Sequence, residues 1–438
     1  MQLFTFRFSC AANPVIGRSR TLRLQLISLF FFAAASMVRG QENAAPSSNA
    51  IDLFKSGTEG FHTFRIPVLL TSKRGTLLAF CEGRRDGIAD HGTIFLLLKR
   101  SFDQGRTWQP VQTVWLEEGR TSGNPAPVVD DATGRILLLF CRNNNSVYLT
   151  ASDDDGASWG QPRDLTRDVR LPGWEWYATG PSPGVCLRKG KPGRLVIPCN
   201  HSVRLKDAHI NRAHVIYSDD HGTTWNLGQG VPLPAGQGGL QTQLDRMELD
   251  YRLNALGTAA AVPSEPDKTP RGLARDQNLI YAGNEASIVE LSDGSLLMNT
   301  RGSILGKPPM RAISKSRDGG VSWEPLTFVP ALVEPGCHAD LRAVTTASGN
   351  PILLFSNPAH PPIPDWDKGR QRMTVKASVD GGKTWPFEKV LHGGPSSYSS
   401  LSVLPDGTVL CLFEGGEKHR REWMQLARFP LSELVPDK

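Results

Sequence analysis

Short apolar runs recur along this chain, and each run lies beside glycine, proline or asparagine. Runs rich in Val, Ile, Leu and Phe that are bounded by turn-forming residues are typical of β-strands. The clearest of them are IPVLL, RILLLF, GRLVIP, GSLLMN, PILLFS and GTVLCLF. Long amphipathic helical patterns are nearly absent, so we predict an all-β protein.

One eight-residue phrase occurs five times, with the pattern Ser-x-Asp-x-Gly-x-(Thr/Ser)-Trp, and it is called the Asp box below. The copies start at Ser101, Ser152, Ser218, Ser316 and Ser378. The Asp can accept hydrogen bonds from nearby backbone amides, the Gly can adopt a positive φ, and the Trp offers a large packing surface. Because each copy follows a strand-like run, the box is predicted to join two antiparallel strands. No Glu stands where the twelfth position of an EF-hand loop would be, so we expect these Asp residues to fold turns and not to bind calcium.

The spacing of the Asp boxes indicates a repeat architecture. The copies start 51, 66, 98 and 62 residues apart, which is wider than the roughly 40 to 45 residues of a WD40 blade but suits larger four-stranded blades with loops. Six such blades would fill the chain after its first residues. We therefore expect a six-bladed β-propeller of four-stranded antiparallel blades over residues 51–438.

The wide gap between the third and fourth boxes predicts an insertion near residues 228–275. Within it, Leu240, Leu244, Met247 and Tyr251 recur at helical spacing, which predicts a helix over one rim of the propeller. Such an insertion can shape a pocket or a partner surface, or it can be a surface loop without a role.

The first 40 residues have the pattern of a secretory signal peptide. Four arginines precede the apolar stretch LQLISLFFFAAASMV, and small and polar residues follow it. The stretch of about 15 residues is shorter than the roughly 20 that a membrane span needs, so stable membrane insertion is not expected. We predict export to the periplasm or the extracellular space, with residues 41–50 as a flexible start of the mature chain.

The composition is that of a turn-rich globular protein, with 39% hydrophobic residues, 43 Gly and 32 Pro. The formal net charge is +6, but Lys and Arg are interspersed with Asp and Glu. Nucleic-acid binding is not expected, because it needs a concentrated basic stripe. Of the seven cysteines, Cys10 lies in the predicted leader. Cys186 and Cys199 flank a hairpin-like segment, and either a disulfide or two buried thiols fits their positions.

Four arginines stand in loop-flanked positions far apart in the sequence: Arg65 in FRIP, Arg84 in FCEGRRDG, Arg301 in NTRGS and Arg370 in GRQRMTV. On a propeller, residues from different blades converge at the central channel. Clustered guanidiniums are costly without an anion and match a carboxylate bidentately. Together these residues predict a carboxylate receptor, although any one of them can instead be a surface ion-pair partner.

The chain resembles secreted bacterial exo-sialidases, or neuraminidases, of the six-bladed propeller type. FRIP, the repeated Asp boxes, NEASIVEL, NTR and a late Tyr occur in the family's order, and the resemblance extends from about Phe61 to Glu414. It implies that Arg65, Arg301 and Arg370 bind the substrate carboxylate, with Arg372 as a rival for the third position. Arg84 is implied to support that carboxylate or the catalytic acid.

The resemblance also implies a general acid on the loop after Arg84, where Asp90 fits best and Asp86 is the alternative. Tyr398 matches the family's nucleophile, and Glu285 matches the glutamate that activates it. A neutral phenol suits a substrate with a carboxylate on its anomeric carbon, because a carboxylate nucleophile would approach against like charge. Displacement through a covalent glycosyl-tyrosine would give retention.

The sequence therefore predicts an exo-α-sialidase that removes terminal sialic acids from sialylated glycans, without a metal or an organic cofactor. Two other functions stay open. The chain can act on a related nonulosonic acid, as a hydrolase or a trans-glycosidase, because these reactions use the same groups. It can also be a non-catalytic propeller that binds acidic sugars.

Overall fold

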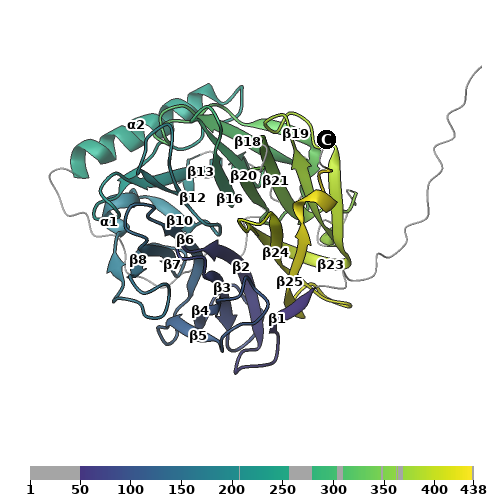
Figure 1. Cartoon of the computed structure of the whole chain (residues 1–438). Coiled ribbons are helices and arrows are strands. Elements are labelled where there is room, and N and C mark those ends of the chain that lie inside the picture. Colours follow the sequence, from purple (N-terminus) through teal and green to yellow (C-terminus); the bar gives the residue numbers. More distant parts are fainter. Residues whose placement is uncertain are drawn as a thin grey trace, which may run out of the picture. The chain divides into compact units, whose positions relative to one another are not determined.

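The computed structural model describes residues 50–206, 208–255, 279–302, 309–346, 349–361, 363 and 368–436. Strands dominate this part of the chain, which confirms the predicted all-β class, and their sheets are arranged like the blades of a propeller (Figure 1). The predicted leader, Cys10, residues 41–49 and residues 256–275 of the predicted insertion lie outside the described residues. Among the described helices, none combines the length and hydropathy needed to cross a membrane.

Three sheets have four strands each, and in all three the strands follow one another in chain order. The first contains β2 (Thr63–Thr71), β3 (Leu77–Arg84), β4 (Ile94–Ser101) and β5 (Gln112–Trp115). The second contains β6 (Ser122–Val129), β7 (Ile136–Arg142), β8 (Ser146–Ser152) and β9 (Arg163–Asp164). The third contains β16 (Ala286–Glu290), β17 (Leu296–Thr300), β18 (Met310–Ser316) and β19 (Thr327–Val333). These sheets match the antiparallel, four-stranded blades that the sequence predicts.

A six-stranded sheet lies between the second and third of these sheets in the chain. Its main path is β10 (Trp174–Thr179), β12 (Leu195–Leu205), β13 (Ala208–Ser218) and β14 (Asn226–Leu227). The short strand β11 (Val185–Cys186) pairs with β12, and β15 (Leu279–Ala282) pairs with β13 in parallel. The described chain also contains the α-helices α1 (Thr166–Val169) and α2 (Gly238–Ala255).

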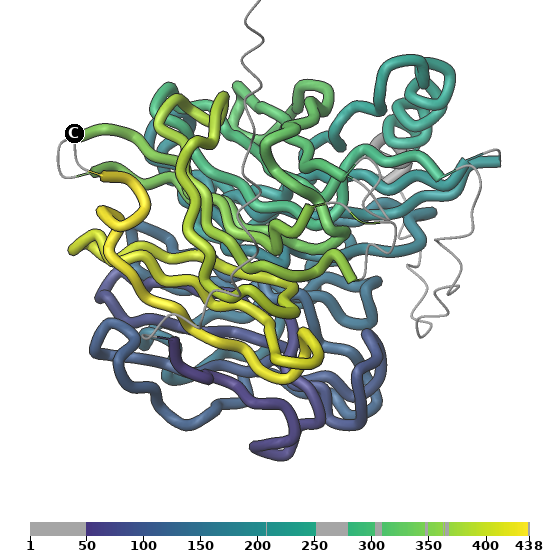
Figure 2. Tube along the Cα trace, turned by 90° about the vertical axis from the view of Figure 1, so that its right-hand side faces the viewer, coloured from purple at the N-terminus to yellow at the C-terminus, as the bar shows by residue number. Residues whose placement is uncertain are grey.

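A seven-stranded sheet contains both the first and the last strands of the described chain. Its order is β1 (Ile51–Lys55), β25 (Trp423–Pro430), β24 (Thr408–Gly415), β23 (Phe387–Val403), β22 (Gln371–Ser378), β21 (Pro351–Pro358) and β20 (Asp340–Thr345). The long strand β23 changes partner along its length, since its first half pairs with β22 and its second half with β24. Pairing of β1 with β25 brings the purple and yellow ends of the trace together in Figure 2. A short 3-10 helix, η2 (Leu431–Glu433), follows β25.

Apolar side chains are buried between neighbouring sheets and not in one central core. One cluster joins Val68 and Phe80 of the β2–β5 sheet to Leu138 and Phe140 of the β6–β9 sheet. The strands nearest the centre also contact across sheets, because β2 approaches both β6 and β23 while β16 approaches β12 and β20. Side chains that point inward from these strands therefore meet although they are distant in sequence.

The Asp boxes fold turns, as predicted from their sequence. In the first box, Asp103 accepts hydrogen bonds from the backbone N–H of Arg106 and Thr107 and from the hydroxyls of Ser101 and Thr107. Gly105 has φ +81° there, in the left-handed region that favours glycine. Each of the five boxes follows a strand that ends at its Ser and precedes the next antiparallel strand. The Asp103 carboxylate thus accepts the hydrogen bonds that close its own turn.

The helix predicted inside the insertion is present as α2. Leu244 of this helix is buried in the cluster that also contains Trp174 and Ile210, and Leu240 and Met247 pack against that cluster. Beside them, Arg212 of β13 donates to the carboxylate of Glu248 at 2.7 Å, and both side chains are largely buried. The helix is therefore anchored on the six-stranded sheet by apolar packing and one buried ion pair.

The six cysteines in the described ranges are free thiols. Cys186 lies opposite Leu195 in the β11–β12 pair, whereas Cys199 lies opposite Thr179 and His214. The strand register therefore separates the two cysteines, and of the two possibilities that the sequence left open the structure has the thiols.

Candidate active site

Seven side chains singled out from the sequence come from three sheets of the propeller. Arg65 lies near the start of β2, Arg84 ends β3, and Asp90 follows in the loop before β4. Glu285 directly precedes β16, Arg301 directly follows β17, Arg370 directly precedes β22, and Tyr398 lies in β23. Their contacts join them into one site.

A break in strand pairing positions Arg65. The register between β2 and β3 shifts between Arg65 and Val68, and Ile66 has φ +62°. A β-branched residue rarely adopts this conformation, and Pro67 after it has no N–H for the ladder. One oxygen of Glu414 accepts from the Arg65 Nε and from the Ile66 N–H, each at 2.9 Å. The carboxylate thereby holds both the strained backbone and the guanidinium.

Arg84 fixes the loop that carries the candidate acid. Its guanidinium donates to Glu82 Oε2 at 2.8 Å, to the Ile88 carbonyl at 2.9 Å and to Asp90 Oδ1 at 2.6 Å. Asp90 Oδ1 also lies 3.4 Å from Nη1 of Arg65. The alternative acid, Asp86, points to the surface and pairs with Arg85. The structure therefore brings Asp90, and not Asp86, to Arg65 and Arg84.

The Asp90 carboxylate is strongly favoured in its ionised form. Its side chain is 76% exposed, and the protein atoms crowded around the loop oppose ionisation. The positive charges of Arg65 and Arg84 outweigh this effect and lower the pKa of Asp90 to about 2. An acid in this place would need another anion nearby to offset those charges before it could hold a proton near neutral pH.

Tyr398 and Glu285 form a directly bonded pair. The phenol donates a hydrogen bond to Glu285 Oε1, and Glu285 Oε2 lies 3.2 Å from Nη1 of Arg301. Tyr398 is 7% exposed, and the Arg65 guanidinium lies 4.9 Å from its ring centre. Burial and the neighbouring Glu285 carboxylate raise the pKa of Tyr398 well above its ordinary value, against the opposing charges of Arg301, Arg65 and Arg370. The phenol is therefore neutral and has an adjacent acceptor for its proton.

Arg370 completes the group of guanidiniums around Tyr398. It lies 3.4 Å from the hydroxyl of Ser397 and donates to the carbonyl of Gly336. Burial and the nearby positive charges of Arg301 and Arg420 lower the pKa of Arg370. The rival Arg372 instead pairs with Glu388 at the surface. A buried guanidinium with carbonyl partners beside a phenol can receive an anionic group.

Comparison with known proteins shows the family to which the chain belongs. A family model described as a BNR repeat-like domain matches residues 75–411. An exo-alpha-sialidase from Aspergillus fumigatus is 32% identical over 90% of this chain and 92% of that protein. The chain belongs to the BNR-repeat sialidase family.

Two further relatives are similar over most of the described fold. A sialidase from Micromonospora viridifaciens is 31% identical over 92% of this chain. The structure of a Hadza microbial sialidase, Hz136, superposes with a TM-score of 0.66 and 26% identity, covering 88% of this chain and 69% of that one. The chain spans 60% of the Micromonospora protein's length.

Two carboxylates of this BNR-repeat sialidase hold the candidate residues and were missed from the sequence. Glu414 binds Arg65, and Glu82 binds Arg84 while its other oxygen accepts from the backbone N–H of Asn124 at 3.0 Å. Glu82 lies two residues before Arg84 in FCEGRRDG, so its place on the same face of a strand was a usable signal. No comparable local signal links Glu414 to Arg65.

The segment before β20 also contributes residues that were not predicted from the sequence. Glu334, which is fully buried, pairs with Arg311 at 2.6 Å and accepts from the backbone N–H of Gly336. His338 follows on this segment, and its ring centre lies 5.8 Å from that of Tyr398. Both ring nitrogens of His338 are buried without a hydrogen-bond partner in the described protein. This segment therefore packs beside the phenol through His338.

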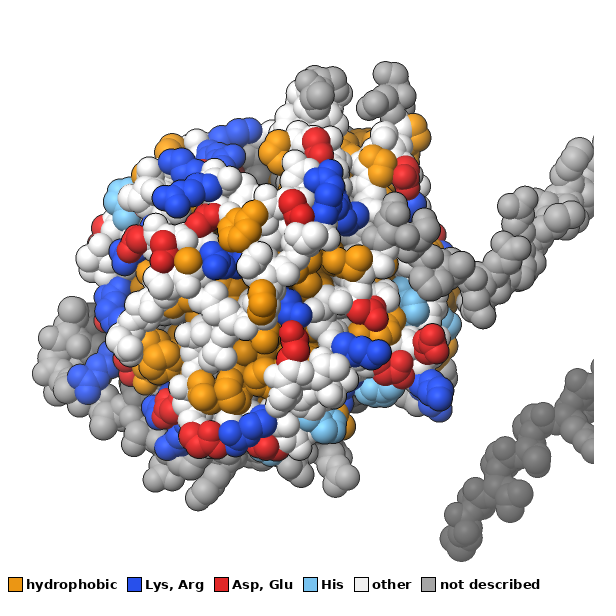
Figure 3. All heavy atoms as spheres, turned by 60° about the horizontal axis from the view of Figure 1, so that its bottom comes forward, with side chains coloured by type: hydrophobic (Ala, Val, Ile, Leu, Met, Phe, Trp, Pro, Cys, Tyr) orange, Lys and Arg blue, Asp and Glu red, His pale blue; other side chains and the backbone are white. Residues whose placement is uncertain are grey.

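In the described ranges, no group of three or more His, Cys, Asp or Glu side chains is placed to hold a metal ion. Charged side chains of both signs are interspersed on the face seen in Figure 3. This distribution matches the mixed charge pattern of the sequence.

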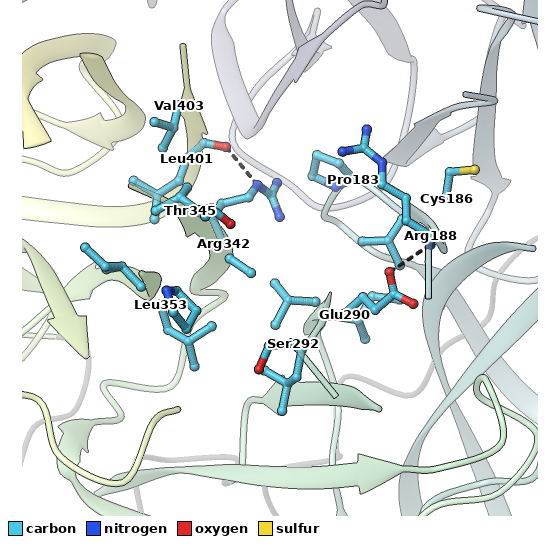
Figure 4. Close-up of a pocket in the computed structure, with 18 of the residues that line it drawn as sticks. Pro183, Cys186, Arg188, Glu290, Ser292, Arg342, Thr345, Leu353, Leu401 and Val403 are labelled. Carbon is cyan, nitrogen blue, oxygen red and sulfur yellow. Dashed lines mark hydrogen bonds between the residues drawn. The ribbon is translucent and has the colours of Figure 1, made fainter. Parts of the chain in front are cut away.

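A cavity of about 770 Å³ lies beyond the site along the inner strands. It is lined by residues that follow the site residues in the chain, such as Leu69 after Arg65 and Leu401 after Tyr398. Figure 4 shows Arg342 beside it, donating to the carbonyl of Leu401. The candidate catalytic residues do not line this cavity.

Proposed function

We propose that this protein is an exo-α-sialidase that hydrolyses terminal α-linked sialic acids of sialylated glycans. The observation that carries this proposal is the hydrogen bond from the buried Tyr398 phenol to Glu285, among the guanidiniums of Arg65, Arg301 and Arg370. The names of the relatives agree with it. The three guanidiniums would bind the carboxylate of the substrate.

The first step would form a covalent glycosyl-tyrosine. The Tyr398 oxygen attacks the anomeric carbon while Glu285 takes the phenol proton, and the bond to the leaving oxygen breaks. Asp90 gives its proton to that oxygen, so the aglycone leaves as a neutral alcohol. Binding of the substrate carboxylate offsets the positive charge of Arg65, which would let Asp90 hold a proton in spite of its pKa of about 2 in the free protein.

The second step would reverse the roles of the same groups. Asp90, now ionised, takes a proton from a water molecule that attacks the anomeric carbon. The bond to Tyr398 breaks, and Glu285 returns the proton to the phenol. Two displacements at one carbon retain its configuration.

We also propose that the fold is a six-bladed propeller. The partner change along β23 supports division of the seven-stranded sheet into β20–β23 and a blade of β24, β25 and β1 with the second half of β23. With the other four sheets this makes six blades. The charge and hydropathy pattern of residues 1–40 supports export with cleavage of a signal peptide.

The test is release of a fluorescent aglycone from an α-linked sialoside by the purified chain. We expect turnover by the wild type and a loss of roughly 100-fold or more in Tyr398→Phe, since the pair supplies the nucleophile and its base. Tyr148→Phe is the matched control, because Tyr148 lies in β8, outside the site, where its hydroxyl contacts Arg142. If the wild type released no aglycone from the sialoside, the proposal would be refuted.

Product analysis separates the remaining alternatives. Lactose added as an acceptor would yield sialyl-lactose if the enzyme transfers the sugar. A deaminated sugar substrate, cleaved in the absence of sialoside turnover, would move the assignment to a hydrolase of a related nonulosonic acid. Mass spectrometry after a fluorinated sialoside should find the label on Tyr398.

A further inference from the structure

Arg421 is a guanidinium near the candidate acid that none of the roles above includes. It lies two residues before β25 and is partly buried. Its Nε is buried without a hydrogen-bond partner, and no described carboxylate lies within ion-pair distance of it. Burial, together with the nearby charges of Arg65 and Arg420, lowers the pKa of Arg421 to about 10, although Glu414 and Asp90 oppose this. Two other guanidiniums, those of Arg65 and Arg420, therefore lie close enough to act on Arg421.

Arg421 lines a cavity of about 590 Å³ that adjoins the loop of Asp90. Ile88, two residues before Asp90, also lines it and is 52% exposed. The carbonyl of Ile88 is held by Arg84, which also holds Asp90. One wall of the cavity and the candidate acid are thus fixed by the same guanidinium. Ligand pockets commonly measure about 300 to 1,000 Å³, so the space suits one sugar unit.

The carboxylates that line this cavity leave Arg421 uncompensated. Glu422 accepts hydrogen bonds from the backbone N–H groups of Glu417, Lys418 and His419. Asp52 accepts from the side chain of Gln425 at 2.8 Å. The third carboxylate of the lining, Glu417, is exposed, and no ion pair joins it to Arg421 in the described structure. A guanidinium without a carboxylate partner favours an anion from outside.

The proposed reaction indicates which part of the substrate lies next to this cavity. Asp90 must lie within hydrogen-bond reach of the leaving oxygen, so the aglycone extends from the sialic acid past the Asp90 loop. We infer that Arg421 and this cavity form a subsite for an acidic aglycone, a second sialic acid whose carboxylate binds the Arg421 guanidinium. This inference rests on the proposed sialidase function and names its preferred substrate class, the sialyl–sialyl linkage.

The experiment compares three substrates that differ in the aglycone. They are a disialyl conjugate, the same conjugate with the inner carboxylate as its methyl ester, and sialyl-lactose. The wild type should cleave the free acid with a kcat/KM roughly tenfold to 100-fold above that of the methyl ester, which is the usual range for a charge-assisted pair. Arg421→Gln should remove this preference and leave kcat/KM on sialyl-lactose within about twofold, since a neutral aglycone makes no ion pair.

Two further variants separate charge from structure. Arg421→Lys keeps the positive charge and should retain part of the preference. Arg85→Gln removes a positive charge from the Asp90 loop, but that side chain is exposed and already paired with Glu118, so the preference should persist. Matching thermal unfolding of the Arg421 variants and the wild type shows that any change in selectivity is not a loss of fold.

Results that contradict the subsite differ from results that contradict the sialidase function. Equal wild-type rates on the free acid and the methyl ester overturn the subsite while leaving the sialidase function intact. A loss on all three substrates in Arg421→Gln also overturns it, because Arg421 would then serve the carboxylate of the outer sugar. No turnover of any substrate by the wild type refutes the proposed function and this inference together.

Discussion

Replacement of Glu414 should disable the site by releasing Arg65. Glu414 is buried, and one of its oxygens binds both the Arg65 guanidinium and the N–H of Ile66. In Glu414→Leu both donors lose their acceptor. Removing one partner of a buried ion pair costs about 3 to 5 kcal/mol, because the remaining charge has no compensation.

Glu414→Gln distinguishes charge from hydrogen bonding. The amide oxygen can still accept from both donors, but the acceptor is neutral. Hydrogen bonds to charged groups contribute about 1.5 to 3 kcal/mol and neutral ones about 0.5 to 1.5, so the Ile66 bond should weaken by roughly 1 kcal/mol. The bond from Arg65 keeps one charge, but the guanidinium loses the opposite charge that offsets its burial. We expect the free energy of unfolding to fall in the order wild type, Gln, Leu, with KM for a sialoside rising in the same order.

The assay is urea denaturation followed by tryptophan fluorescence, combined with steady-state kinetics. Glu433→Gln serves as the control, because that carboxylate pairs with Lys389 at the surface and such exposed pairs contribute about 1 kcal/mol or less. If Glu414→Leu were as stable as the control and kept the wild-type KM, Glu414 would not position Arg65 and the reasoning would be wrong.

Four other perturbations have defined outcomes. Asp90→Asn should slow hydrolysis of natural glycosides far more than that of aryl sialosides with good leaving groups, which need little protonation. Folding lowers the pKa of Asp90 from 3.8 to about 2, so its ion pairs stabilise the fold above about pH 4. Urea titrations should show that this contribution disappears as the pH falls toward 2 in the wild type. Asp90→Asn should not show this loss, because it has no carboxylate there to protonate. Asp340→Ala should lower the free energy of unfolding by about 3 kcal/mol in the same assay, since it leaves the largely buried guanidinium of Arg342 without its carboxylate partner. The melting temperature should be the same with and without a reductant, because Cys186 and Cys199 are free thiols; a drop on reduction would indicate a disulfide.

The turns and strands of this protein were predictable because their causes are local. Each Asp box contains its own acceptor, its own glycine and its own tryptophan, so the folded turn is encoded within eight residues. The alternation of apolar runs and turn residues likewise indicated the strands. The pairing register depends on contacts between distant strands, and it places Cys186 and Cys199 opposite other residues, so they do not form a disulfide.

The candidate site was predictable where the family resemblance marked a residue, and not where support comes from another blade. Tyr398 and Glu285 were matched from separate phrases, and the structure joins them by a hydrogen bond. Glu414 and His338 carry no local signal, because their importance arises only when β24 and the segment before β20 meet the start of β2 and the middle of β23. Their roles therefore needed the tertiary structure.

Asp340 joins the segment next to the site to a strand that lines the 770 Å³ cavity. It is fully buried and accepts hydrogen bonds from Ser182 and Ser400 and from the backbone N–H of Leu401. Asp340 is the first residue of β20 and stands between His338, whose ring lies near that of Tyr398, and Arg342, which lines the cavity. Burial raises the pKa of Asp340, yet Arg342 and these donors favour its charged form. Segments from different sheets thus converge on one buried carboxylate, because the donors come from the loop before β11 and from β23 while Asp340 begins β20.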